Sequence, residues 1–213
     1  MTVPITLTSP PAALPAKQRI RQAFDRAAAT YDAAADVQRE VCDRLAICFQ
    51  QAGIDLDPEA ILDAGCGTGL AGIALRNAGF VQVDGFDIAP AMTEKAEQTG
   101  AYRRLLADID LNADDPGLGE FAETYDIVTC AGVFTLGHVA PEGLRHLFSL
   151  ARPGGFVIVS TREDYLKKTD FRGHAKHVEE GGQAALVVTL PEAGYVGDDQ
   201  ADYWVFRKLP AQK

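Results

Sequence analysis

The stretch Ile61–Leu70 constrains the fold of this chain more than any other. Its sequence, ILDAGCGTGL, runs from apolar residues into one acidic residue and then into three glycines at alternate positions. This pattern predicts a buried strand that ends in a tight turn and opens directly into a helix, because glycine adopts backbone angles that other residues avoid. The free N–H groups at the start of that helix would point into the turn. The sequence therefore predicts a site for a nucleotide-like cofactor.

The spacing of the glycines separates two classes of cofactor. The dinucleotide fingerprint G-x-G-x-x-G requires a glycine or alanine at position 70, where this chain has Leu70. The string DAGCGTG instead resembles motif I of the class I S-adenosylmethionine (SAM)-dependent methyltransferases, in which the loop wraps the amino-acid part of SAM. The resemblance implies that the following residues bind the cofactor: Asp63, Ala64, Gly65, Cys66, Gly67 and Gly69.

Size and charge limit the remaining possibilities. A chain of 213 residues suits one α/β domain with a sizeable core. The formal net charge of −10 repels phosphate groups, so the sequence disfavours nucleic acid as a partner and an anionic membrane as an anchor. No basic region followed by a long apolar run stands at the N-terminus, which favours a soluble protein that is not exported.

The cysteines indicate a reducing compartment. Cys42, Cys48, Cys66 and Cys130 form no C-x-x-C pair and no spacing typical of a zinc site. We therefore expect reduced thiols, a cytoplasmic location and no metal.

The N-terminal part of the chain predicts a helical cap. Residues 1–16 contain four prolines and little charge, which predicts a flexible tail. Helices are expected over residues 17–30 and about 34–52, with Gly53 ending the second. The sequence FDRAAATYD at residues 24–32 is similar to the F-x-x-x-A-x-x-Y-D segment of ubiquinone- and biotin-synthesis-type methyltransferases. That resemblance implies that Tyr31 lies against the cofactor; an ordinary interface tyrosine is an equally good interpretation.

Acidic residues follow the next two predicted strands. Asp87 ends the strand 81–87, where one carboxylate can accept hydrogen bonds from both ribose hydroxyls, about twenty residues beyond the glycine loop. Asp108 follows the strand 102–107. By resemblance to motif III, Asp108 accepts from the adenine amino group and Ile109 covers the ring. Ile88 is a further candidate for cofactor binding. Met92 resembles the family methionine that packs near the adenine, and a plain core position is the alternative.

The fourth strand leads to a candidate catalytic group. Residues 125–131 resemble motif IV and end in Ala131, a further candidate for cofactor binding. The apolar loop 132–139 that follows contains His138. Ligands of open α/β sheets bind outside the carboxyl ends of the strands, so we expect His138 to line the acceptor side. Its ordinary pKa of about 6.5 suits a general base near neutral pH. A solvent-exposed loop histidine is the alternative.

Alternating strands and helices predict a sheet that is mostly parallel, with helices on both faces. The last two predicted strands, 185–190 and 203–208, are joined without a helix and must therefore be antiparallel. We expect an α/β fold over residues 17–213, as one SAM-dependent methyltransferase domain. Its core would be a Rossmann-like seven-stranded sheet with an antiparallel last strand.

These features together favour methyl transfer from SAM to a small-molecule or carrier-bound acceptor. In-line displacement from a sulfonium requires alignment of acceptor and methyl, and no metal. The N-terminal segment resembles biotin-synthesis malonyl-carrier methyltransferases, whereas residues 133–162 look more like Williams-Beuren-region methyltransferase-like proteins. Two alternatives remain. One is a non-catalytic SAM-binding partner subunit. The other is an NAD(P)-dependent oxidoreductase, although no tyrosine has a lysine four residues later. The sequence leaves the oligomeric state open.

Overall fold

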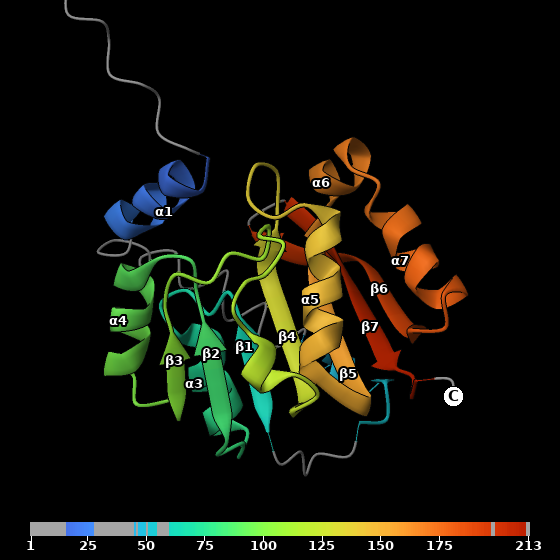
Figure 1. Cartoon of the computed structure of the whole chain (residues 1–213), viewed down its shortest axis with the longest axis horizontal. Helices are drawn as coiled ribbons and strands as arrows, with labels where there is room; N and C mark the ends of the chain where they lie inside the picture. Colours follow the sequence, from blue (N-terminus) through green and yellow to red (C-terminus); the bar gives the residue numbers. More distant parts are fainter. Residues whose placement is uncertain are drawn as a thin grey trace, which may run out of the picture.

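A single sheet forms the centre of the structure, a computed structural model that describes residues 16–27, 45, 47–49, 51–54, 60–196 and 199–211. Within these residues the sheet has seven strands in the order β3-β2-β1-β4-β5-β7-β6 (Figure 1). They are β1 (Ile61–Ala64), β2 (Val83–Phe86), β3 (Arg104–Leu106), β4 (Tyr125–Phe134), β5 (Ala151–Arg162), β6 (Ala184–Val196) and β7 (Asp199–Lys208). Neighbours from β3 to β5 pair in parallel, and β7 is antiparallel to both β5 and β6. The predicted mostly parallel sheet with a reversed last strand is therefore confirmed.

Helices cover both faces of this sheet (Figure 1). The helices of the described residues are α1 (Ala16–Ala27), α3 (Leu70–Asn77), α4 (Pro90–Gln98), α5 (Leu144–Leu150), α6 (Glu163–Lys168) and α7 (Phe171–Glu180), with short 3-10 turns at Gly119–Phe121 and Pro141–Gly143. Residues 45, 47–49 and 51 are helical as well, and Gly53 follows them at a φ of 61°. None of the described helices is long and apolar enough to cross a bilayer.

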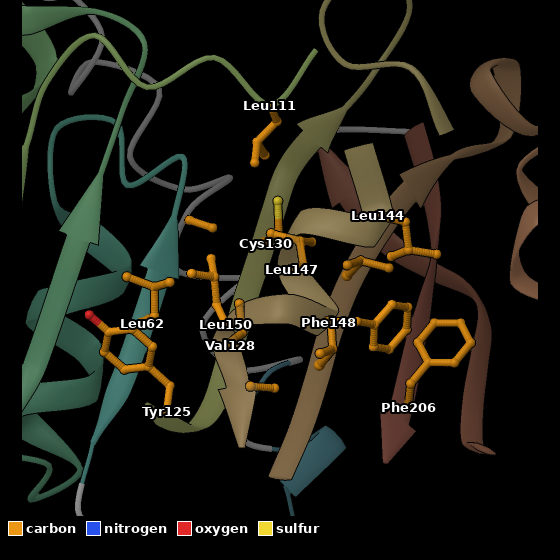
Figure 2. Packing of buried hydrophobic residues seen from close by; sticks show 14 of the residues in the cluster. Leu62, Leu111, Tyr125, Val128, Cys130, Leu144, Leu147, Phe148, Leu150 and Phe206 are labelled. Carbon is orange, nitrogen blue, oxygen red and sulfur yellow. The ribbon is translucent and has the colours of Figure 1, made fainter. Parts of the chain in front are cut away.

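Alternate residues of each strand supply the cores on the two faces. Leu62 and Val128 belong to the core beneath α5, whose Leu147 packs on that face (Figure 2). Their neighbours Ile61 and Ile127 belong to the other core, which also holds Leu45, Cys48, Phe49 and, from α3, Leu75. Successive side chains of a strand point to opposite faces, so a strand buried on both sides reads as a continuous apolar run. The apolar runs from which the strands were predicted arise because these strands are buried on both faces.

Several predicted boundaries were wrong. β4 continues to Phe134 through an irregular register, so the first residues of the predicted loop 132–139 are strand. Residues 152–155, whose sequence RPGG is typical of a turn, lie within β5. β6 and β7 extend over most of the predicted connection 191–202, because each strand supplies the other with hydrogen-bond partners. Pro191 is tolerated there because β6 is an edge strand.

The helix α6 was not predicted, since only its Tyr165 is fully buried and a six-residue helix carries little periodic signal. At the other end of the chain, α1 begins at Ala16, the last residue of the predicted tail. Residues 1–15 lie outside the described residues.

Candidate functional site

The loop after β1 depends on its glycines. Gly65, Gly67 and Gly69 have φ values of 76°, 52° and 95°, which favour glycine. A Cβ at Gly65 would lie 2.3 Å from Cγ2 of Val133, whereas a Cβ at Gly67 would meet nothing within 4 Å. The loop is thus packed tightly on its β4 side and borders open space at Gly67, where a ligand could reach the main chain.

Asp87 joins this loop to the ends of β2 and β3. Its Oδ2 accepts the Gly67 N–H at 3.0 Å, and its Oδ1 accepts the Ala89 N–H at 2.9 Å. Its main-chain carbonyl accepts the N–H of Ile109 at 3.2 Å. Burial raises the pKa of the carboxyl group, and the backbone donors oppose that rise. A carboxylate has about four acceptor positions, so both oxygens retain capacity for further donors.

Asp63 forms a second buried acidic centre beside the loop. The hydroxyl of Tyr102 donates to Asp63 Oδ2 at 2.6 Å and accepts the N–H of Gly72, in the first turn of α3, at 3.1 Å. Burial raises the pKa of Asp63 to about 6, and the Tyr102 hydrogen bond opposes that shift. The sequence interpretation missed Tyr102, whose only local signal is its place two residues after the helix-ending Gly100.

The close approach of Tyr102 to α3 leads to a stability prediction. A Cβ at Gly72 would lie 2.2 Å from Cζ of Tyr102. We expect Gly72→Ala to lower the free energy of unfolding by about 1–3 kcal/mol, because overpacking outweighs the gain of roughly 1 kcal/mol in helix propensity. Chemical denaturation measures the change. Gly119→Ala is the matched control, since a Cβ there meets nothing within 4 Å. Equal stabilities of the two variants would show that the ring moves aside freely.

The helix α1 lies across the carboxyl ends of β2 and β3 (Figure 1). Arg21 forms an ion pair with Asp108, and Asp25 accepts the N–H of Ala91 at 3.1 Å, at the start of α4. Asp108 has a φ of 65°, an uncommon conformation for a residue with a side chain. The candidate adenine acceptor is therefore held by a cation of the N-terminal helix.

The structure places the other predicted cofactor residues in different surroundings. Met92 is 1% exposed and forms a small apolar cluster with Ala89, against which Phe24 and Ile88 pack. Ala64 ends β1, and Ile109 is half-buried against the core beneath α5. Cys66 is buried, and Ala131 of β4 packs against the core on the α3 face. Tyr31 lies outside the described residues.

His138 follows β4 in a loop that neighbouring elements hold in place. The side-chain amide of Asn112 donates to the His138 carbonyl at 2.6 Å and accepts the Ala140 N–H at 2.9 Å. The hydroxyl of Tyr165, in α6, donates to the carbonyl of Val139 at 2.8 Å. The sequence interpretation missed both side chains, because each acts across a long separation in the chain.

The imidazole of His138 has two further neighbours. Its Nδ1 lies 2.5 Å from Oγ1 of Thr135, and its ring lies 5.0 Å from the ring of Phe24 in α1, measured between centroids. Burial lowers the pKa of His138, so the neutral ring predominates at pH 7. A role as base at Nε2 requires the tautomer in which Nδ1–H donates to Thr135. The helix α1 thus contacts both the candidate base and the candidate adenine acceptor.

The polar groups of the loop suit a ligand with both donors and acceptors. Thr68 is 4% exposed, and its Oγ1 has no hydrogen-bond partner among the described residues. A buried hydroxyl without a partner is costly, and a polar ligand would satisfy it. Together with the open space at Gly67 and the remaining capacity of Asp87, this arrangement fits a nucleoside that carries an amino-acid group. In the part of the chain that the structure describes, no group of three or more His, Cys, Asp or Glu is placed to hold a metal.

Comparison with known proteins finds relatives by sequence and a shared fold among solved structures. A malonyl-[acyl-carrier protein] O-methyltransferase of Serratia marcescens is 35% identical over 147 residues, 68% of this chain and 53% of that protein. Methyltransferase-like protein 27 of Homo sapiens is 35% identical over 142 residues, 65% of this chain and 56% of that protein. The chain therefore spans about half the length of these curated relatives.

Among solved structures, magnesium protoporphyrin IX methyltransferase from Synechocystis PCC 6803, with bound SAM, superposes with a TM-score of 0.68 at 20% identity. The superposition covers 92% of this chain and 99% of that one, and it shows a shared fold. A family model described as a methyltransferase domain matches residues 33–200. The chain belongs to this methyltransferase domain family.

Proposed function

We propose that this protein is a SAM-dependent methyltransferase that acts on a small-molecule or carrier-bound acceptor. The observation that carries the proposal is the hydrogen bond between Asp87 Oδ2 and the N–H of Gly67, 3.0 Å long. It brings the glycine loop and the acid after β2 into one site, within a chain of the methyltransferase domain family. A nicotinamide-dependent oxidoreductase gains no support from that family match, and Leu70 departs from its glycine spacing.

Each part of the site has a role in this proposal. The loop Gly65–Gly69 and Asp63 would hold the amino-acid part of SAM, and Thr68 Oγ1 offers that part a further hydrogen bond. Asp87 would accept the ribose hydroxyls. Asp108, Ile109, Ile88 and Met92 would surround the adenine, and Ala131 would complete the pocket. When bound, SAM supplies a methyl group that its sulfonium has already activated.

His138 would serve the acceptor. In the tautomer with Nδ1–H bonded to Thr135, Nε2 can take a proton from a hydroxyl, thiol or amine. The name of the Serratia marcescens relative gives a malonyl group as the acceptor, and the free carboxyl of such a group would be deprotonated at neutral pH and would need no base. A measurable role for His138 would therefore favour an acceptor that carries a proton.

The proposal also includes the surroundings of the site. Residues 17–213 would form one domain, with about 17–52 as a helical cap, supported by the contacts of α1 with Asp108 and His138. The net charge of −10 disfavours nucleic acid as the acceptor. A cytoplasmic location is supported by Cys48, Cys66 and Cys130, which are buried free thiols.

Cofactor selectivity tests the proposal directly. We expect calorimetry to show binding of SAM or of its product S-adenosylhomocysteine, and no heat of binding with NAD, because the site offers a ribose acceptor but lacks the dinucleotide glycine spacing. Binding of NAD in preference to SAM would contradict the proposal. Transfer of a labelled methyl group from SAM into a product of a crude extract would then separate an enzyme from a non-catalytic SAM-binding subunit.

A further inference from the structure

Tyr102 stands at the centre of the packing beneath the glycine loop. A Cβ added to Gly69, Gly72 or Gly85 would lie 3.1, 2.2 or 2.9 Å from atoms of its ring. These glycines belong to three different elements: the loop after β1, α3 and β2. The backbone thus leaves side-chain space on three sides for one aromatic ring. The ring brings a single polar atom, its hydroxyl, to Asp63 Oδ2 and to the N–H of Gly72.

We propose that Tyr102 is a positioning residue of the cofactor site, whose hydroxyl fixes the Asp63 carboxylate against the first turn of α3 and keeps it available as an anion. The proposal rests on the proposed SAM site. It assigns Tyr102 no contact with SAM, because the hydroxyl acts through Asp63 and through the backbone of α3. A phenylalanine would fill the same space between the glycines and lose only this function.

The charges around Asp63 explain why an anion at this position matters. The groups that act on its carboxyl are the Tyr102 hydroxyl, the Asp87 carboxylate and the Thr129 hydroxyl, and none of these is a cation. Asp63 and Asp87 are each less than a tenth exposed, and the Asp87 carboxylate stands close enough to raise the pKa of Asp63. An ammonium group, which SAM and S-adenosylhomocysteine both carry, would relieve that repulsion, provided that Asp63 is ionised when the ligand arrives.

The hydroxyl of Tyr102 affects whether Asp63 is ionised. Its hydrogen bond favours the ionised carboxylate and opposes the rise in pKa that burial and Asp87 cause. Removing it raises the pKa of Asp63 above about 6, so Asp63 stays protonated to a higher pH. The thiols of Cys66 and Cys130 also face this site, but burial raises the pKa of each, so both stay neutral near pH 7. The pKa of Tyr102 itself is raised by burial and by Asp63, and it also stays neutral.

The decisive experiment measures the affinity for S-adenosylhomocysteine by calorimetry between pH 5.5 and 8. For Tyr102→Phe we expect about a tenfold loss near pH 6.5, the size of effect typical of a hydrogen bond to a charged group, with partial recovery by pH 8. Tyr125→Phe is the matched control. It also removes a buried hydroxyl, 3.0 Å from the carboxylate of Asp84, and Arg103 and Arg104 continue to bind that carboxylate. Its pH profile should coincide with that of the wild type.

A double-mutant cycle distinguishes positioning from a loss of structure. Asp63→Asn removes the charge, so its affinity should fall and lose the pH dependence that Asp63 contributes. If Tyr102 acts through Asp63, adding Tyr102→Phe to Asp63→Asn should cost little more. Additive losses, or a Tyr102→Phe profile parallel to that of Tyr125→Phe, would overturn the proposal. Where Tyr102→Phe fails to fold, an unchanged pH profile for Asp63→Asn would overturn it as well. A wild type that does not bind S-adenosylhomocysteine would instead refute the proposed function.

Discussion

Asp87→Ala is expected to lower the affinity for SAM by roughly 10²-fold or more. Two hydrogen bonds from ribose hydroxyls to a carboxylate contribute about 1.5–3 kcal/mol each, and both disappear with the side chain. The structure adds a second cause, because the same carboxylate accepts the N–H groups of Gly67 and Ala89. Without it Gly67 loses its hydrogen bond to the end of β2, and the loop keeps the bonds from the N–H groups of Gly65 and Cys66 to the Phe86 carbonyl. Calorimetric titration with SAM, together with thermal unfolding to establish that the variant folds, measures the effect.

The control for this variant is an aspartate that lies away from the loop. Asp114 is fully exposed and lies 3.5 Å from Arg145, so Asp114→Ala should bind SAM as the wild type does. Asp87→Asn gives a finer comparison, since the amide retains one acceptor oxygen and adds a donor facing backbone N–H groups. We expect it to fall between the wild type and Asp87→Ala. An unchanged affinity in folded Asp87→Ala would show that another residue holds the ribose.

His138→Ala is expected to reduce turnover by roughly 10²–10⁴-fold while SAM affinity remains that of the wild type, if the acceptor must lose a proton. The base has to be neutral, and burial places its pKa below the ordinary value. The rate of the wild type should therefore fall as the pH drops through that lowered pKa, and it should be level at pH 7. Single-turnover measurements with an identified acceptor test both statements.

Two further variants test the tautomer of His138 and provide a control histidine. Thr135→Val removes the oxygen 2.5 Å from Nδ1, so the required tautomer loses its acceptor and turnover should fall by a smaller factor. His177→Ala, at an exposed position of α7, should leave turnover unchanged. Near-normal turnover in His138→Ala would leave alignment of acceptor and methyl as the whole contribution of the protein.

The parts of the fold that the sequence predicted well are those that local physics determines. The turn after β1 needs three glycines at positive φ, and few other residues meet that requirement. The reversed strand follows from the absence of a helix between two apolar runs, since a parallel pair needs a long crossover. Asp87 lies at a strand end, where the spacing from the loop predicted a site residue, and the structure brings it within 3.0 Å of that loop.

What the sequence did not predict depends on contacts between distant segments. Tyr102 meets Asp63 across 39 residues, and Arg21 meets Asp108 across 87. No periodicity in the intervening sequence encodes such distances. The loop that contains His138 shows the same limit. Asn112, which precedes it in the sequence, and Tyr165, which follows it, both donate hydrogen bonds to its carbonyl groups. Local patterns thus predicted the residues at strand ends, whereas the side chains that orient them appear only once the sheet is assembled.

The reversed end of the sheet bears on how the protein is made. β7 lies between β5 and β6, although it follows both in the chain. During synthesis β6 therefore emerges before the strand that joins it to the sheet, and β5 presents an open edge for the same interval. Exposed edges recruit other strands, so nascent chains are prone to associate with one another at this stage. Ribosomal pausing before Asp199 would prolong that interval.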